Sequence, residues 1–271
     1  QLILIYMIQT INRRLPHFIK ETFFWRIARH FNKFYLKNYD HIKTNTHPPI
    51  HLKGLATDTI SQQILFTGYY DDNLTQFIQK IGRNGGTFVD VGANIGYCSN
   101  LFAAQNKNNI VYSFEPSLSN LELLKHNINL NHLKQQIQVL DVAVGQVESE
   151  MYFENGPKEQ TGWGHLSTEK TGQKVKVITL DLFFKEISTP IDLLKIDVEG
   201  FDLQVILGAR ELLQKGLIKN IIFEYHHELL INRVKLSEEA KQIIELFELN
   251  QYEIKRFAAH DYLVQKKLKK D

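Results

Sequence analysis

The sequence has little cysteine, little excess charge and no long apolar run. Its one cysteine cannot form an intrachain disulfide, and no cysteine–histidine set has the spacing of a zinc finger. The formal net charge of +2 is far from that of a typical nucleic-acid binder, and 43% hydrophobic residues are too many for a disordered chain. We therefore expect a globular protein in the reducing cytoplasm that does not bind nucleic acid.

The apolar run at residues 2–8 is shorter than the roughly 20 residues that a membrane span needs. Aromatic and basic residues follow it, so contact with a membrane surface is an alternative to a helix packed on the body. Pro48 and Pro49 would end a helix that begins near Phe18. We expect an N-terminal helical extension at residues 1–57 and one domain at residues 58–271.

From residue 87 onward, short apolar runs alternate with helical patterns. Strands are predicted at residues 87–91, 110–114, 137–140, 175–180, 191–196, 220–224, 251–257 and 261–265. Helices are predicted at about residues 96–105, 117–129 and 201–215, and after the capping residue Ser237. This alternation predicts an α/β fold with a parallel sheet covered on both faces. The last two strands are too close for a helical crossover, so we expect them to pair antiparallel.

The loop after the first of these strands reads Asp90-Val91-Gly92-Ala93-Asn94-Ile95-Gly96. In a parallel sheet a ligand lies at the carboxyl ends of the strands, and glycines let the backbone approach it closely. Asn94 replaces the second glycine of a dinucleotide-binding loop. Asp90 would repel a pyrophosphate but would suit a ligand with an amine. A tight turn without a ligand is the alternative.

Acidic residues also follow the next two strands. Glu115, between Phe114 and Pro116, can accept hydrogen bonds from both hydroxyls of a ribose, unless it is an ordinary exposed residue before a helix. Asp141 could contact an adenine edge while Val142 and Ala143 contact the ring. Amine, ribose and adenine in this order indicate S-adenosylmethionine.

Four motifs closely resemble those of FkbM-family methyltransferases: Val89-Asp90-Val91-Gly92-Ala93-Asn94-Ile95-Gly96, Phe114-Glu115-Pro116, Ala143-Val144-Gly145 and Lys195-Ile196-Asp197-Val198-Glu199-Gly200. The resemblance spans about residues 58–226. It implies a doubly wound, Rossmann-like class I methyltransferase fold, whose mostly parallel seven-stranded sheet has an antiparallel last strand. It also implies S-adenosylmethionine-dependent O-methylation of a sugar, glycan or small natural product.

By the same resemblance, particular residues hold each part of the cofactor. The residues carried over are Asp90, Gly92, Ala93, Asn94 and Gly96 for the methionine part, Glu115 and Pro116 for the ribose, and Asp141 and Val142 for the adenine. The Asp197-Val198-Glu199-Gly200 segment is expected to face the cofactor from the fourth strand.

A base near the acceptor would help methyl transfer, because a hydroxyl is a poor nucleophile until its proton leaves. The candidates at neighbouring strand ends are Asp197, Glu199, Glu224, His226 and His227. We expect Asp197 to contact the acceptor hydroxyl or the cofactor's ammonium group, and His226 to be the base, although a surface role for His226 is the alternative. Asp197 and Glu224 could instead bind a divalent metal, but no ligand spacing supports this, so no metal is predicted.

Residues 154–174 contain four glycines around Trp163 and His165. The segment is long for a connection, which indicates an acceptor-binding lid or else a disordered surface insert. A nicotinamide-dependent oxidoreductase and a non-catalytic S-adenosylmethionine-binding protein are the competing functional hypotheses. Nothing in the sequence indicates an oligomeric state.

Overall fold

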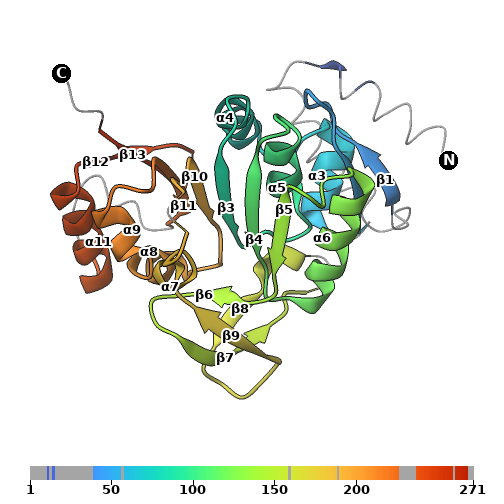
Figure 1. Ribbon diagram of the computed structural model, residues 1–271. Helices are drawn as coiled ribbons and strands as arrows, with labels where there is room; N and C mark the ends of the chain where they lie inside the picture. The colour runs from blue at the N-terminus through green and yellow to red at the C-terminus, as the bar shows by residue number, and fades with distance from the viewer. Residues whose placement is uncertain are drawn as a thin grey trace.

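The computed structural model describes residues 39–55, 58–157, 160–187, 189–225, 236–258 and 260–267, together with residues 11, 14 and 15. These residues form a central sheet with helices on both faces, and a smaller sheet lies next to one end of it (Figure 1).

The central sheet has seven strands in the order β12-β13-β11-β10-β3-β4-β5. Their bounds are Thr87–Val91 (β3), Ile110–Phe114 (β4), Ile137–Leu140 (β5), Leu193–Ile196 (β10), Asn220–Glu224 (β11), Tyr252–Arg256 (β12) and Asp261–Lys266 (β13). Strand β13 runs antiparallel to both of its neighbours, and the remaining pairs are parallel. This arrangement confirms the predicted class I methyltransferase topology.

The strand order reverses between β3 and β10. The chain builds β3, β4 and β5 outward in one direction and later returns to the other side of β3 to build β10 and β11. At such a reversal the connections leave in opposite directions, which opens a crevice beyond the carboxyl ends of the strands.

Two sets of helices cover the two faces of this sheet (Figure 1). One face carries Thr59–Thr67 (α3), Asp72–Gly82 (α4), Tyr97–Ala103 (α5) and Leu118–Leu130 (α6), and the other carries Leu180–Phe183 (α7), Asp202–Leu207 (α8), Arg210–Gln214 (α9) and Glu238–Leu249 (α11). Ser237 caps α11 as predicted, because its hydroxyl accepts the N–H of Ala240 at 3.1 Å.

The helix predicted at residues 201–215 is two helices, α8 and α9. Gly208 lies between them, where an added Cβ would be 2.0 Å from the carbonyl oxygen of Gly145. The chain therefore approaches a neighbouring backbone at this point, and a continuous helix does not form.

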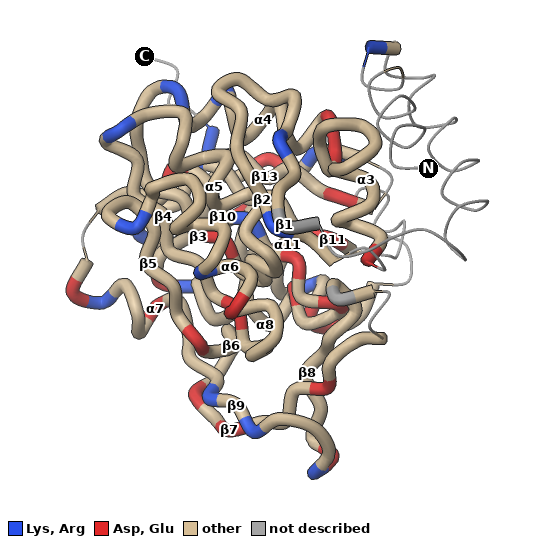
Figure 2. The backbone as a smooth tube through the Cα atoms, turned by 90° about the vertical axis from the view of Figure 1, so that its right-hand side faces the viewer, with Lys and Arg blue, Asp and Glu red and all other residues tan. Residues whose placement is uncertain are grey.

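A second sheet of four strands has the order β6-β9-β7-β8. Its strands are Ala143–Val144 (β6), Ser149–Glu154 (β7), His165–Ser167 (β8) and Gln173–Ile178 (β9). It lies at the carboxyl ends of the central strands, and β7 and β9 project away from the body in both views (Figures 1 and 2). The run predicted as a strand at residues 175–180 thus belongs to this second sheet.

Part of the predicted helical extension is a β-hairpin. Tyr39–Lys43 (β1) and His51–Gly54 (β2) pair antiparallel, and Ile42, Ile50 and Leu52 are buried in the core below α3 to α6. The prediction of a helix was therefore wrong for residues 39–54. The rest of the extension, apart from residues 11, 14, 15 and 55, lies outside the described residues, and the division at residue 57 stays a prediction.

Amide side chains of α6 fasten this hairpin to the domain. The side chain of Asn127 accepts the N–H of Lys53 at 2.6 Å and donates to the carbonyl oxygen of Lys53 at 3.2 Å. Asn131 pairs in the same way with His51, at 2.8 and 2.7 Å.

Positions of acidic and basic residues are interspersed along the described backbone (Figure 2). Within the described ranges, the helices are all too short or too polar to cross a membrane.

Candidate functional site

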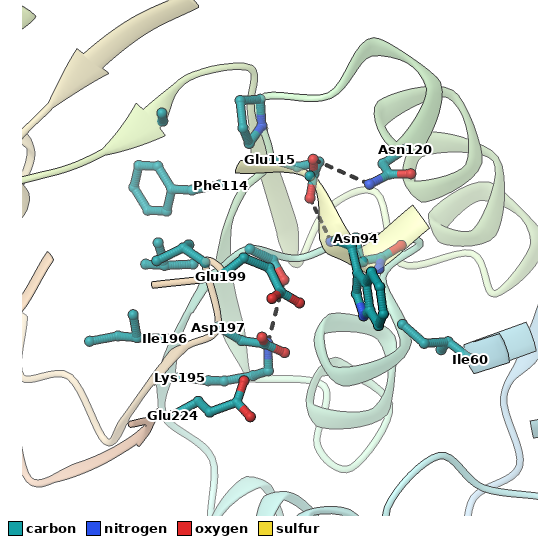
Figure 3. A pocket seen from close by; sticks show the side chains of 18 of the residues that line it. Ile60, Asn94, Phe114, Glu115, Asn120, Lys195, Ile196, Asp197, Glu199 and Glu224 are labelled. Atoms are coloured by element: carbon teal, nitrogen blue, oxygen red, sulfur yellow. Dashed lines mark hydrogen bonds and ion pairs between the residues drawn. The ribbon is translucent and has the colours of Figure 1, made fainter. Parts of the chain in front are cut away.

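A cavity of about 610 Å³ lies at the carboxyl ends of β3, β4, β10 and β11. Its walls come from these strand ends, from the start of α3 and α4, and from the second sheet. Figure 3 shows Glu115 with Asn94 and Asn120 at one end and Lys195, Asp197 and Glu224 at the other. The size is that of a small-molecule site, and the position agrees with the rule for open α/β sheets.

The loop from β3 to α5 forms the floor between the two ends. The N–H groups of Gly92 and Ala93 both donate to the carbonyl oxygen of Phe114 at 3.0 Å, which fixes the loop against β4. Gly92 has a φ of 79°, and an added Cβ would lie 1.9 Å from the carbonyl oxygen of Asp197. Only glycine permits this approach between the loop and the end of β10.

Glu115 is held rigidly at the end of β4. One carboxyl oxygen accepts the N–H of Asn94 at 2.7 Å, and the other accepts the N–H of Ser117 at 2.9 Å and the side-chain amide of Asn120 at 3.5 Å. The residue is only 3% exposed. Burial raises the pKa of Glu115 to about 7, although the hydrogen bonds from Ser117 and Asn94 act in the opposite direction.

Apolar side chains line the cavity next to Glu115. Pro116 comes from the β4–α6 connection, Val142 from the β5–β6 connection and Phe153 from β7. Asp141, which the sequence placed on the adenine, is exposed and does not line this cavity. The next three residues, Val142, Ala143 and Val144, do line it, where the chain enters the second sheet.

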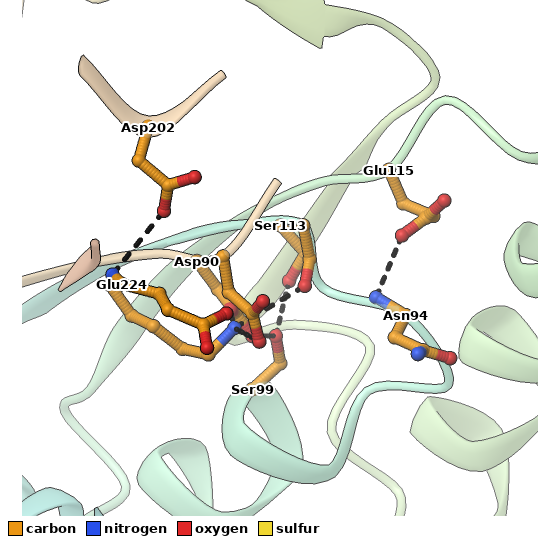
Figure 4. A network of polar contacts seen from close by, with 10 residues as sticks. Asp90, Asn94, Ser99, Ser113, Glu115, Asp202 and Glu224 are labelled. Atoms are coloured by element: carbon orange, nitrogen blue, oxygen red, sulfur yellow. Dashed lines mark hydrogen bonds and ion pairs between the residues drawn. The ribbon is translucent and has the colours of Figure 1, made fainter. Parts of the chain in front are cut away.

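Asp90 does not line the cavity either. It is fully buried below the floor, where one carboxylate oxygen accepts the hydroxyl of Ser99 at 2.5 Å and the other lies 3.6 Å from Lys195 Nζ (Figure 4). The prediction that Asp90 contacts the cofactor's amine therefore lacks support from the structure, and Asp90 instead holds Lys195. Ala93 and Gly96 are also buried behind the loop rather than on the cavity wall.

Lys195 is a cavity residue to which the sequence analysis gave no role. Its ammonium group lies 3.2 Å from Asp197 Oδ2 and donates to the carbonyl oxygen of Gly92 at 3.4 Å, and its side chain is 7% exposed. Burial lowers its pKa, but Asp197 and Asp90 outweigh this effect, and the pKa of Lys195 lies well above its usual value. The sequence did contain a signal for Lys195. It lies within the apolar run of β10, and a charged residue is seldom buried there without a partner.

Carboxylates gather at the other end of the cavity. Asp197, Glu199 and Glu224 line it, as the sequence predicted, and Asp261 of β13 joins them without having been predicted. Glu224 and Asp261 are direct cross-strand partners in the β11–β13 pair. Burial, together with the charges of Glu224 and Asp197, raises the pKa of Asp261 to about 7.

Asp202 connects the turn after β10 with the end of β11. Its carboxylate accepts the N–H of Glu224 at 3.4 Å and the N–H of Gly200 at 3.3 Å (Figure 4). Burial, followed by the charge of Asp197, raises the pKa of Asp202 to about 7. Glu199, with a φ of 51°, occupies the left-handed region in the same turn, a strained conformation that is concentrated at functional sites.

The predicted lid contributes a wall of the cavity. Gly162, Trp163 and Gly164, in and after the short 3-10 helix Thr161–Trp163, line it together with Leu166 of β8. An added Cβ on Gly162 would lie 3.3 Å from Ile60 and 3.5 Å from the side chain of Asn94, so this turn covers the loop. Trp163 is 57% exposed at this edge. Opening and closing of the segment stays a prediction.

Two further predictions concern the histidines after β11 and a bound metal. His226 and His227 lie outside the described residues, so their position relative to Glu224 is not part of the structure. In the described part of the chain, histidine, cysteine, aspartate and glutamate form no group of three with metal-binding geometry.

Comparison with known proteins gives similarities of three kinds: to a family, to a curated protein and to solved structures. Residues 90–254 match the family described as the methyltransferase FkbM domain. Hexuronic acid methyltransferase AglP from Haloferax volcanii is 30% identical over 167 residues, which cover 60% of this chain and 66% of AglP. The structure of methyltransferase FkbM from Methylobacillus flagellatus KT has a TM-score of 0.45 and 15% identity, over 77% of this chain and 55% of that chain.

A further solved structure is fibrillarin from Aeropyrum pernix, in complex with natively bound S-adenosyl-L-methionine. It has a TM-score of 0.40 and 10% identity, over 66% of this chain and 65% of fibrillarin. The chain thus spans just under two thirds of AglP and just over half of the FkbM structure.

Proposed function

The chain belongs to the FkbM methyltransferase domain family, and we propose that it uses S-adenosylmethionine to methylate a hydroxyl group of a sugar, a glycan or a small natural product. The observation that carries this proposal is that two motifs far apart in the sequence, around Glu115 and Asp197, line one cavity. AglP is named as a methyltransferase of a hexuronic acid, which supports a sugar as acceptor.

The residues of the cavity fit this cofactor. A carboxylate has about four acceptor positions, and Glu115 uses three for its protein partners, so it can still accept a ribose hydroxyl. Val142 and Phe153 provide apolar contacts for a flat ring beside it. The left-handed turn at Gly92 and Asn94 leaves room for the methionine part between Glu115 and Asp197.

When bound, S-adenosylmethionine supplies a methyl group on a positively charged sulfur. In our proposal the carboxylate of Asp197 accepts a hydrogen bond from the acceptor hydroxyl and takes its proton during transfer. Lys195 holds that carboxylate in place through the contact at 3.2 Å. Most of the rate enhancement then comes from the position of the acceptor oxygen.

Glu199 and Glu224 line the same end and are proposed to orient the acceptor. His226 is a second candidate for the base, since it follows Glu224 by two residues in the chain. A divalent metal at Asp197 and Glu224 is not proposed, because the described residues form no such group of ligands.

Calorimetric titration tests the proposal directly. We expect S-adenosylmethionine and S-adenosylhomocysteine to bind at a single site, and NAD to give no heat of binding. Transfer of labelled methyl to a panel of hydroxylated sugars would then separate an enzyme from a protein that only binds the cofactor. Binding of NAD in preference to S-adenosylhomocysteine would refute the proposal.

A further inference from the structure

The turn that carries Trp163 lies over the cofactor end of the cavity. On one side of it, Gly162 approaches the β3–α5 loop, where an added Cβ would lie 3.5 Å from the side-chain nitrogen of Asn94. On the other side, Gly164 packs so closely on Phe153 that an added Cβ would overlap its ring. Trp163 therefore stands between the loop proposed for the methionine part and the apolar ring proposed beside the adenine.

Short-range contacts hold Trp163 in this place. Its N–H donates to the carbonyl oxygen of Gln160 at 3.1 Å, and Gly156 packs against it, since an added Cβ there would lie 3.1 Å from Trp163 Cβ. Among the described residues, Trp163 is the one exposed large apolar residue that lines the cavity, and it is 57% exposed. The protein therefore leaves much of this ring uncovered at the cavity wall.

The loop next to this turn contains a polar atom without a partner. Asn94 Oδ1 is buried, and no described residue donates a hydrogen bond to it. A buried acceptor without a donor costs free energy, so such an atom calls for a donor that the chain itself does not supply. Asn94 lines the cavity, and the ammonium group of the cofactor's methionine part is a donor of this kind. The turn thus covers a place that a bound cofactor completes.

The sulfur of S-adenosylmethionine joins its ribose to its methionine part. In the proposed binding mode, Glu115 holds the ribose and the β3–α5 loop holds the methionine part, so the sulfur lies between them, next to the turn of Trp163. This sulfur carries a positive charge, and an indole is the aromatic face that attracts a cation most strongly. When the methyl group leaves, the electron pair of the broken bond stays on the sulfur, which becomes neutral.

We propose that Trp163 covers the sulfonium of bound S-adenosylmethionine and recognises its positive charge through the face of the indole. This inference rests on the proposed function and adds a cofactor-binding residue to it. It places Trp163, within the segment predicted as an acceptor-binding lid, on the cofactor. Because S-adenosylhomocysteine is neutral at sulfur, the indole favours the reactant over the product. The contact is present before transfer and weakens during it, so it raises affinity rather than kcat.

Fluorescence tests whether the cofactor covers Trp163. The chain has two tryptophans, so Trp25→Phe leaves Trp163 as the single one. S-adenosylhomocysteine alone, without any acceptor, should shift the emission of Trp163 to shorter wavelength and lower its quenching by acrylamide. A sugar acceptor alone should change neither quantity.

Calorimetry tests the recognition of charge, through the ratio of the dissociation constants of S-adenosylhomocysteine and S-adenosylmethionine. Trp163→Leu keeps an apolar side chain but removes the aromatic face, so this ratio should fall about fivefold, mainly because S-adenosylmethionine binds more weakly. Trp163→Phe keeps a weaker aromatic face and should give an intermediate ratio. Leu249→Ala, which removes an exposed apolar side chain outside the cavity, should leave the ratio unchanged. Circular dichroism shows whether each variant is folded.

The outcomes separate this inference from the proposed function. If the wild-type protein binds neither S-adenosylmethionine nor S-adenosylhomocysteine, the proposed function fails. If both bind but acrylamide quenches Trp163 as before, Trp163 does not cover the cofactor, and the inference is refuted while the methyltransferase is not. If folded Trp163→Leu loses affinity for both ligands equally, the indole does not recognise the charge, and the inference is refuted in the same way.

Discussion

The two ends of the cavity are built in opposite ways. At the cofactor end, the single carboxyl group of Glu115 accepts two backbone N–H groups and an amide from residues within 21 positions of it in the chain. At the acceptor end, carboxylates of Asp71, Asp197, Glu224 and Asp261 meet from elements spread over most of the domain. The first end is built from near neighbours in the chain, and the second from residues that only the fold brings together.

Within the proposed function, this difference places acceptor specificity at the second end. A carboxyl group held by its own backbone donors is already in place before the ligand arrives, which suits a cofactor that never changes. A group of carboxylates brought together by strand pairing can be altered one residue at a time without disturbing the loop at Gly92. We infer that acceptor choice can vary in this fold while the cofactor end stays the same.

The largest loss of cofactor affinity and stability is expected at Gly92, where the β3–α5 loop contacts the end of β10. Gly92→Ala places a Cβ 1.9 Å from the carbonyl oxygen of Asp197 and forces alanine into a φ of 79°. We expect cofactor affinity to fall at least about a hundredfold and the free energy of unfolding to fall by about 2–3 kcal/mol. Titration with S-adenosylhomocysteine and urea denaturation measure these two quantities.

Gly85→Ala is the matched control for this variant. Gly85 has a similar φ of 77°, but an added Cβ there would meet nothing closer than 3.6 Å. It should show the strain of the left-handed conformation without the loss of cofactor binding. Equal losses in both variants would mean that backbone strain, rather than contact with Asp197, explains the effect.

A smaller and more selective effect is expected at the acceptor end. Asp197→Asn keeps the shape of the side chain but removes the proposed base, so kcat should fall about a hundredfold. Affinity for S-adenosylhomocysteine should change much less, because the contacts of Glu115 are untouched. Steady-state kinetics and calorimetry check the two parts of this prediction.

Asp192→Asn provides the control at the opposite end of β10. Asp192 also pairs with a lysine, Lys219, at 2.7 Å, but it lies away from the cavity. This variant should retain wild-type kcat. A normal kcat in Asp197→Asn would remove Asp197 from the reaction.

The smallest effect concerns the pH dependence of stability and arises at the cofactor end. The pKa of Glu115 is about 7 in the folded protein and near 4.5 without the fold, so its ionisation opposes folding. Its contribution to stability is full below about pH 4.5 and is lost as the pH rises through about 7. Between about pH 5 and pH 8, the wild-type protein should therefore lose about 2 kcal/mol relative to Glu115→Gln.

Urea denaturation of the ligand-free proteins at both pH values measures this difference. Glu122→Gln, on the exposed side of α6, should follow the wild type. If the wild type and Glu115→Gln lose stability in parallel, the carboxyl group is ionised at both pH values and the raised pKa is incorrect.

Much of the cofactor end could be predicted because its signals are local. Glycines at 92 and 96, and an acidic residue at the end of the next strand, are adjacent in the sequence to the strands that position them. The same reasoning did not foresee that Asp90 would lie below the floor. A strand residue points to one face or the other, and the side chain of Lys195 from β10 occupies the region above it.

The acceptor end could be predicted only in part. Asp197 and Glu224 follow strands whose apolar runs are clear in the sequence. Asp261 begins a strand that runs in the opposite direction, so the rule that searches the carboxyl ends of parallel strands passes over it. The β-hairpin at residues 39–54 was missed because its few apolar residues become a recognisable pattern only when they pack below α3 to α6.

The sequence by itself determined the alternation of strands and helices, the turn at Gly92 and the position of Glu115, since each depends on backbone conformation and hydrogen bonds between near neighbours. The tertiary structure decided which carboxylates face each other, and it placed Asp261 beside Glu224 and Lys195 between Asp90 and Asp197. Strand pairing sets these contacts, and the pairing is fixed by burial of the two faces of the sheet rather than by any single stretch of chain.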